Sequence, residues 1–360
     1  MQGKDLTNEE EKFICENNIG GIVLFARNLD NPKQIHQLIS RLQSLRKKQL
    51  DQAPLFIATD MEGGRVSSLS APFTIWPSLN KVSALNSTSV AFRMAQCMGA
   101  ELSAVGINVD FAPCVDVLTN PQNHLIGDRS AGTTADQVGK ITSALVRGYI
   151  KSGIIPCAKH FPGHGNTIAD SHEELPVDSI SIQDLTNQLL PPFKKVFKSR
   201  LDMVMTAHIK FPAIDPDWPV TLSEKFLKNF LRNDIRYRNL VLADDLEMKA
   251  LSKNYDRQKI PVLALKAGID MLLYCHEPAS CAPAFDAVMA AANTKELDML
   301  ALGKIHERIL QIKKSKLTQP DPIPFTEAEQ IIGHTDHMAL AQAIVEGRIL
   351  ESPGGSDDSN

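Results

Sequence analysis

The sequence lacks the features that mark secreted and membrane-spanning proteins. Only 6 of its 360 residues are cysteine, and none of them forms a CxxC pair or the spacing of a disulfide framework. Free thiols in apolar segments suit a reducing compartment. No apolar signal core follows Met1, and no hydrophobic run is long enough to cross a bilayer. We therefore expect a cytoplasmic protein without a membrane partner.

Neither sign of charge is in large excess, and cofactor motifs are lacking. The 38 basic and 42 acidic residues give a net charge of -4, and no basic, aromatic-rich patch predicts a nucleic-acid partner. No GxGxxG follows the first predicted strand, and no HExxH helix is present. We expect no cofactor and no metal, and we expect the protein to act as a monomer.

What the sequence does contain is a regular alternation of apolar strands and amphipathic helices. Nearly continuous apolar strands belong to a parallel sheet covered by helices. Eight such units form a (β/α)₈ TIM-type barrel, and the short segment 219–222 could be the eighth strand. A doubly wound open sheet is the alternative, which the missing GxGxxG and the spread of polar residues over most strand ends disfavour. The seven clear strands are 20–26, 54–59, 107–113, 154–158, 203–208, 239–243 and 270–274.

The pattern changes towards the end of the chain. From about residue 296 only helical periodicity is found, interrupted by a proline-rich connector. We predict an α/β catalytic domain over 1–318 and a C-terminal helical extension over 319–350. The Gly/Ser/Asp-rich residues 351–360 are expected to be a disordered tail.

One stretch organises the polar residues. Residues 159–165 read KHFPGHG, directly after the strand 154–158, and residues 170–172 read DSH. A buried strand that delivers Lys159 and His160 into a Gly/Pro loop is typical of catalytic sites in α/β proteins. Asp170 can fix the tautomer of His172 and raise its basicity, although an Asx-turn with an exposed histidine is an equal alternative.

Other strand ends add carboxylates. Asp60 follows one strand, and Asp244 and Asp245 follow another. Two buried carboxylates would repel each other, so we expect one to face the pocket and the other to find a partner. Asp245 could cap a helix over 246–251, which leaves Asp244 as a nucleophile or base. His208, at a further strand end, could equally be a satisfied core histidine.

These motifs resemble those of the glycoside hydrolase family 3 β-N-acetylglucosaminidases, in particular the bacterial single-domain type of peptidoglycan recycling. KHFPGHG followed by DSH is a very specific signature. Further matches occur in the same order over roughly residues 5–275: GGIVLF at 20–25, DMEGGRV at 60–66, DFAP at 110–113, GDRS at 127–130, MTAH at 205–208 and DDLEM at 244–248.

The resemblance implies a retaining β-hexosaminidase on a (β/α)₈ barrel. By their places in the motifs, Asp244 would be the nucleophile and His172 the general acid/base, oriented by Asp170. Four further residues would hold the hydroxyls of a terminal N-acetylglucosamine: Asp60, Arg129, Lys159 and His160. The implied substrate is a small carbohydrate or muropeptide.

The match has a departure, and other functions remain open. The family usually has an arginine where Ser68 stands, so one sugar-binding cation is missing or supplied elsewhere. Phosphorolysis, or another β-glycosidase specificity, could use the same site. A metal-dependent hydrolase built on His160, His164 and the Asp170–His172 pair is a second class, and a non-catalytic sugar-binding barrel is a third.

Overall fold

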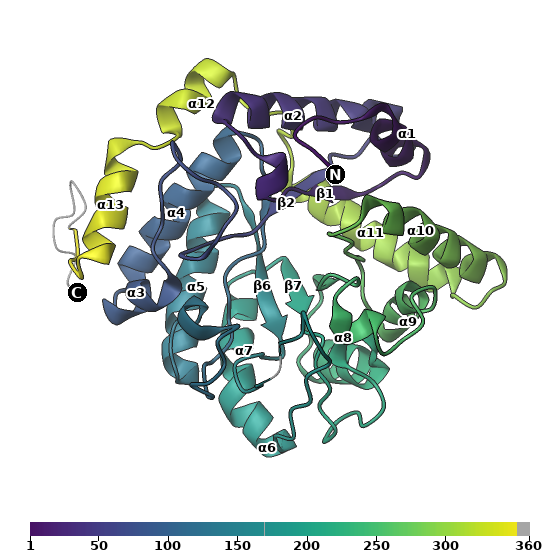
Figure 1. The fold of residues 1–360 in the computed structure, drawn as a ribbon. Helices are drawn as coiled ribbons and strands as arrows, with labels where there is room; N and C mark the ends of the chain where they lie inside the picture. The colour runs from purple at the N-terminus through teal and green to yellow at the C-terminus, as the bar shows by residue number, and fades with distance from the viewer. Residues whose placement is uncertain (169, 351–360) are drawn as a thin grey trace.

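The computed structural model describes residues 1–168 and 170–350 (Figure 1). Its main sheet has six parallel strands whose spatial order follows the chain order without a reversal. This one-directional winding excludes the doubly wound alternative, in which the order reverses at a switch point. The prediction of a single α/β domain of TIM-like type is confirmed, in the form of a curled half-barrel. The strands are β1 (Gly21–Val23), β2 (Phe56–Thr59), β5 (Val109–Asp110), β6 (Ile155–Phe161), β7 (Met203–Thr206) and β8 (Leu240–Ala243).

The curled sheet continues for a few residues beyond β8. Met271 pairs with Leu242 in a parallel bridge, and the Ala243 N–H donates to the Met271 carbonyl at 3.0 Å. A cavity of about 260 Å³ lies between the segment 271–273 and β1. Within the described ranges, no strand ladder joins this segment to β1, so the sheet is not closed there.

The expectation that residues 219–222 supply an eighth strand is wrong. Val220–Leu222 form a short 3₁₀ turn, η5, in which the Leu222 N–H donates to the Pro219 carbonyl. The Thr221 hydroxyl bonds to Thr206 and His208, and these tertiary contacts hold the segment in a turn. An extra antiparallel hairpin, β3 (Met61–Gly63) with β4 (Val66–Ser67), follows β2 instead.

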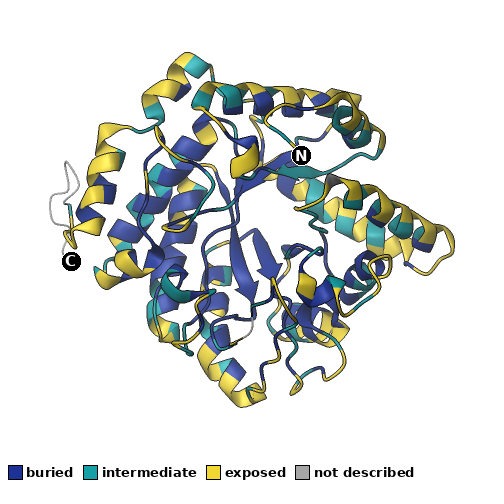
Figure 2. Ribbon diagram, viewed as in Figure 1, coloured by how far each residue is buried: buried dark blue, intermediate teal, exposed yellow. Residues whose placement is uncertain are grey.

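Two apolar layers enclose the sheet, whose strands β2, β5, β6, β7 and β8 are buried, while β1 is partly exposed (Figure 2). Alternate residues of each strand point into the barrel, because side chains alternate across a strand. Their neighbours face the outer helices, which explains the nearly continuous apolar runs of the sequence. The inner layer, closed by Ile312 and Leu317, comprises Phe56, Ala58, Val109, Phe111, Ile155, Cys157, Met203, Met205, Leu240 and Leu242.

Amphipathic helices form the outer layer, in alternation with the strands as the sequence predicts. The buried face of α2 (Pro32–Ser44) contains Ile35, Leu38, Ile39 and Leu42, as its periodicity predicts. The remaining elements of this part are α1 (Asn8–Glu16), η1 (Ala26–Asn28), η2 (Leu45–Lys48), α3 (Leu79–Ala84), α4 (Thr88–Ala104), η3 (Gly127–Arg129), α5 (Ala135–Lys151), α6 (Ile182–Asp184), η4 (Leu185–Leu189), α7 (Leu190–Lys198), η6 (Lys225–Asp234) and α8 (Lys249–Ser252).

The C-terminal third is helical. The helix α10 (Pro278–Asn293) was not predicted; it accommodates an internal proline, Pro283. Before and after it come α9 (Ile260–Ala267), α11 (Met299–Lys316), α12 (Phe325–Ile331) and α13 (Thr335–Val345).

The last two helices are packed against the barrel. In Figure 1, α12 and α13 lie along α2, α3 and α4, and Leu340 and Ile344 of α13 join the main core. The domain boundary at residue 318 stays a prediction, and the predicted tail 351–360 lies outside the described residues. No described helix is both long and apolar enough to cross a membrane.

Candidate active site

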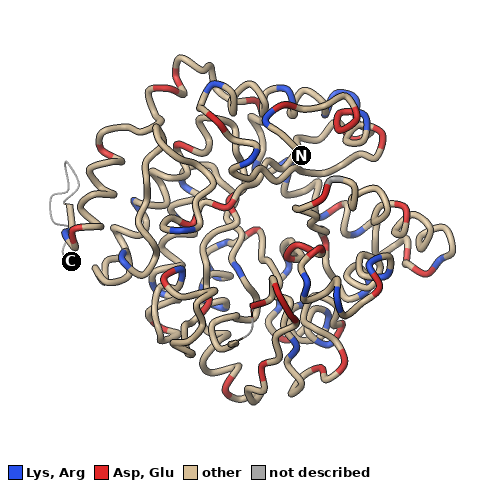
Figure 3. Tube along the Cα trace, viewed as in Figure 1, with Lys and Arg blue, Asp and Glu red and all other residues tan. Residues whose placement is uncertain are grey.

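Four of the seven predicted site residues lie at the carboxyl ends of strands, whereas Arg129 ends η3 and Asp170 and His172 lie on the loop after β6. Asp60 directly follows β2, Lys159 and His160 lie near the end of β6, and Asp244 directly follows β8. Parallel strands of a barrel present these ends at one mouth. Elsewhere, basic and acidic residues are mixed over the outer helices (Figure 3).

Glu62, a residue that the sequence analysis did not single out, lies at the centre of a buried network of opposite charges. Lys159 Nζ pairs with Asp60 and lies 2.7 Å from Glu62 Oε1. Arg129 binds both oxygens of Glu62, at 2.7 and 2.9 Å. Burial opposes charge on Glu62, but Arg129 and Lys159 outweigh it and hold the Glu62 pKa well below its usual range. Two cations are therefore fixed and neutralised before any ligand arrives.

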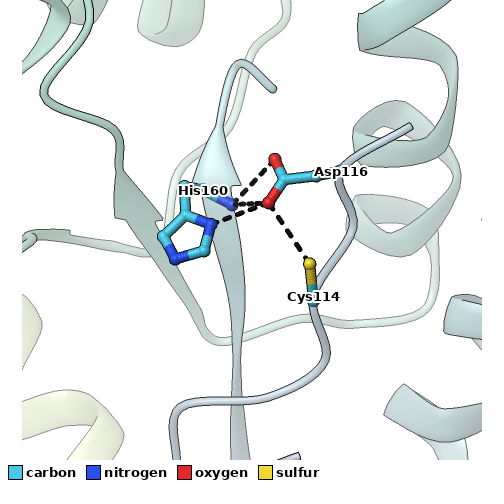
Figure 4. Close-up of side chains that lie close together, drawn as sticks. All are labelled: Cys114, Asp116 and His160. Carbon is cyan, nitrogen blue, oxygen red and sulfur yellow. Dashed lines mark hydrogen bonds and ion pairs between the residues drawn. The ribbon is translucent and has the colours of Figure 1, made fainter. Parts of the chain in front are cut away.

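His160 is oriented by a second residue missing from the sequence analysis, Asp116 (Figure 4). Its Nδ1 lies 2.7 Å from Asp116 Oδ2. Burial of Asp116 would raise its pKa, but His160 and His164 hold that pKa at about 2. The ionised carboxylate accepts, so Nδ1 carries the hydrogen and the other ring nitrogen, Nε2, is left facing Arg129 at 3.4 Å.

Among the described residues, metal-binding geometry includes His160 but not the other residues that the metal-dependent alternative invoked, His164, Asp170 and His172. Within the described ranges, donor atoms lie within 4.8 Å of one another in the group Cys114, Asp116 and His160. The Cys114 thiol and the His160 ring already donate to Asp116, so hydrogen bonds satisfy this group. A second group combines Asp245 with a glutamate and a histidine, and it is considered next.

The two carboxylates after β8 differ in their surroundings. Asp245 is buried and pairs with His276, and its Oδ1 accepts from the Glu247 N–H at 3.1 Å. Burial raises the pKa of Asp245. The expected helix cap is wrong, because α8 begins only at Lys249 with Met248 as its N-cap. The expectation that one of the pair finds a partner agrees with the Asp245 contacts.

Asp244 is partly exposed and has a different electrostatic environment. Burial opposes its ionisation, but His208, His160, the Asp245 N–H and Lys159 together lower the pKa of Asp244. His208 is the satisfied core histidine that the sequence allowed: it bonds to Thr221 Oγ1 at 2.7 Å and to the Asp245 carbonyl at 3.0 Å. Asp244 is therefore held as a carboxylate at neutral pH.

Asp170 and His172 form a pair on the loop after β6. Asp170 Oδ1 accepts from the His172 N–H and lies 2.8 Å from His172 Nδ1, so the turn and the side-chain pair both exist. The side chains are 45% and 54% exposed. The loop is tied to the chain after Asp244, because the Ala250 N–H donates to the Ser171 carbonyl at 3.2 Å.

Residues 2–312 match the family described as "Glycosyl hydrolase family 3 N terminal domain". The chain belongs to glycoside hydrolase family 3.

Several β-hexosaminidases and related proteins are similar to this chain. The chain is 32% identical to a β-hexosaminidase of Idiomarina loihiensis, over 89% of this chain and 95% of the relative. A β-N-acetylglucosaminidase of Paenibacillus sp. superposes with a TM-score of 0.89 at 33% identity, over 99% of this chain and 68% of that one. NagZ of Neisseria gonorrhoeae, solved with N-trifluoroacetyl-D-glucosamine, gives a TM-score of 0.77 at 28% identity, over 96% of both chains. The protein therefore groups with the β-hexosaminidases of family 3.

The family 3 motif around Arg65 has a structural task here. Arg65 Nη2 donates to the His124 carbonyl at 2.9 Å and to the Leu125 carbonyl at 2.5 Å, which fixes the loop that leads to Arg129. The backbone N–H of Ser68, where an arginine was expected, donates to the Asp60 carbonyl. Ser68 thus supports Asp60 through its backbone and offers no cation of its own.

Proposed function

We propose that this protein is a retaining exo-β-N-acetylglucosaminidase that removes terminal N-acetylglucosamine from muropeptide fragments in the cytoplasm. It acts as a monomer without a cofactor. The β-hexosaminidase names of its relatives and the glucosamine derivative in the gonococcal structure support this sugar class.

In this proposal Asp244 is the nucleophile. A nucleophile must be ionised before the substrate binds, and the cationic surroundings of Asp244 favour that state. The carboxylate attacks the anomeric carbon, the bond to the leaving oxygen breaks, and a glycosyl-enzyme forms. Water then displaces Asp244, and the product keeps its β configuration.

His172 is the proposed general acid/base. Asp170 accepts from Nδ1, so Nε2 is the nitrogen that can deliver a proton to the leaving oxygen and later take one from water. The exposure of both side chains suits a group that must exchange its proton with solvent between turnovers. The usual glycosidase places a second carboxylate in this role.

The sugar hydroxyls are the proposed ligands of four residues. Asp60 and His160 Nε2 offer acceptors, while Lys159 and Arg129 offer charged donors already fixed by Glu62. Because these groups are held in place beforehand, little ordering entropy is lost when the sugar binds.

One observation carries the proposal: the hydrogen bond between Ala250 and Ser171 ties the loop of His172 to the chain segment that follows Asp244. The test uses 4-nitrophenyl β-N-acetylglucosaminide, compared with the β-glucoside and β-xyloside. Asp244→Asn should lower kcat by at least about 10³-fold while the protein stays folded. A 2-deoxy-2-fluoro or 5-fluoro sugar should label Asp244; labelling of Asp245 would overturn the assignment.

The same assay separates the alternatives. Hydrolysis predicts free N-acetylglucosamine whether or not phosphate is present, whereas a phosphorylase would release the sugar 1-phosphate when phosphate is added. Activity that disappears with a chelator and returns with a metal ion would move the protein to the metal-dependent class. Tight binding of N-acetylglucosamine without turnover would identify a sugar-binding barrel.

A further inference from the structure

Ser171 stands between the two exposed members of the Asp170–His172 pair and points the other way. Ser171 is only 3% exposed, whereas the side chains of Asp170 and His172 are about half exposed. The Ser171 hydroxyl lies 3.1 Å from Nε2 of His164.

His164 is buried, 2% exposed, and both of its ring nitrogens are used. Nδ1 lies 2.8 Å from the Thr167 hydroxyl, which itself donates to the His164 carbonyl at 3.0 Å. A hydroxyl has one hydrogen, so Thr167 accepts from Nδ1–H. Nε2 is therefore an acceptor, and the Ser171 hydroxyl donates to it. Burial lowers the His164 pKa to about 4, which keeps the ring neutral and this arrangement intact at neutral pH.

Hydrogen bonds connect the His164 backbone to the carboxylate that orients His160, one of the proposed sugar ligands. The His164 N–H donates to Asp116 Oδ1 at 2.7 Å, and Asp116 is the carboxylate that orients His160. Asn123 Nδ2 donates to the His164 carbonyl at 2.7 Å. On its other side, the Ser171 carbonyl accepts from Ala250. A continuous chain of contacts thus runs from His160 to the acid/base pair and on to the segment after Asp244.

We propose that Ser171 and His164 are positioning residues for the acid/base: their hydrogen bond sets where His172 stands relative to the scissile bond. Neither residue touches the substrate. The inference rests on the proposed function, because it needs His172 to be the proton donor. A displacement of about 1 Å in a catalytic group is enough to cost on the order of 10²-fold in rate.

The experiment measures kcat/KM on two substrates, because kcat/KM covers substrate binding and cleavage of the first bond but not the later hydrolysis of the glycosyl-enzyme. One has an activated leaving group, 4-nitrophenyl β-N-acetylglucosaminide, which leaves with little protonation. The other, methyl β-N-acetylglucosaminide, needs the acid. Ser171→Ala should lower kcat/KM on the methyl glycoside by about 10- to 100-fold and on the nitrophenyl glycoside by less than about 3-fold. Thr167→Val is the matched control, since it removes the other hydroxyl bound to His164 but leaves the Ser171 contact in place.

Each outcome has a distinct meaning. The proposal is supported if Ser171→Ala lowers kcat/KM on the methyl glycoside much more than on the nitrophenyl glycoside. Thr167→Val should then have kcat/KM values near those of wild type, and both variants should melt at the wild-type temperature. Equal slowing of both substrates, or the same loss in Thr167→Val, overturns it and indicates general loosening of the loop. His172→Ala serves as the reference: if its loss does not depend on the leaving group, the proposed function fails. If His172→Ala is selective and Ser171→Ala is not, only the positioning role fails.

Discussion

The contact of His337 with Glu101 should make the docking of α13 depend on pH. His337 Nδ1 lies 2.7 Å from Glu101 Oε1, and the Glu101 carboxylate also accepts from the Thr74 N–H and hydroxyl. Burial by itself would lower the His337 pKa, but hydrogen bonds to Cys97 and Glu101 raise it to about 9. The test is His337→Gln, which keeps a donor but cannot titrate.

The magnitude follows from the two pKa values. The folded value of about 9 exceeds the unfolded value of about 6.5, a difference worth at most about 3 kcal/mol. The His337 side chain is 14% exposed, so solvent screening leaves about 1–3 kcal/mol. Because the folded pKa is the higher one, this stabilisation is complete below about pH 6.5 and is lost as the pH rises through about 9.

The assay is urea unfolding of wild type and His337→Gln at pH 6 and pH 9.5, together with hydrogen exchange of the α13 amides. The free energy of unfolding of wild type should exceed that of His337→Gln by about 1–3 kcal/mol at pH 6, and the two values should be nearly equal at pH 9.5. Protection factors of the α13 amides, which correct for the base catalysis of exchange itself, should fall between pH 6 and pH 9.5 in wild type only. A difference that stays constant over this range would refute the reasoning.

Two further predictions concern buried charges. Burial lowers the pKa of Lys313 to about 8, and its carbonyl partner Gly20 also accepts from the Phe56 N–H. Lys313→Met should therefore raise the free energy of unfolding at pH 7 by about 1–2 kcal/mol, measured by urea unfolding. Wild type should gain stability as the pH rises from 8 to 10.5, and Lys313→Met should lack this gain. Glu62→Gln should lower stability by about 3–5 kcal/mol in the same assay, because it leaves the Arg129 and Lys159 charges without their shared partner; a loss below about 1 kcal/mol would contradict this account.

The sequence predicted strands such as β2, β6, β7 and β8 because they are buried at every position. An apolar run such as that of β8 has no alternative to the interior of a layered α/β protein. The segment 219–222 is also apolar, but the Thr221 hydroxyl bonds to Thr206 and His208. Local composition does not reveal such tertiary contacts, so a turn was predicted as a strand. The helix α10 was missed because Pro283 interrupts its pattern.

The site was predicted only in part, because several of its contacts also join residues that are far apart in the sequence. Motifs place Lys159 and His160 at a strand end, but the carboxylates that hold them are remote in sequence. Glu62 lies 67 positions from Arg129, and Asp116 lies 44 positions from His160. Glu62 stood within the motif at 60–66 and could have been noticed as an acid directly before two glycines. Nothing near Asp116 indicates that its carboxylate is shared by two histidines.

The position of β8 at the end of the sheet order has a consequence for biosynthesis. A nascent chain that has emerged only through β7 already contains the paired cations of the mouth but not the carboxylate of Asp244. Under the proposed chemistry it is inert towards glycosides, however well its earlier strands have folded. On the same proposal, chains that terminate before β8 have no hydrolytic capacity.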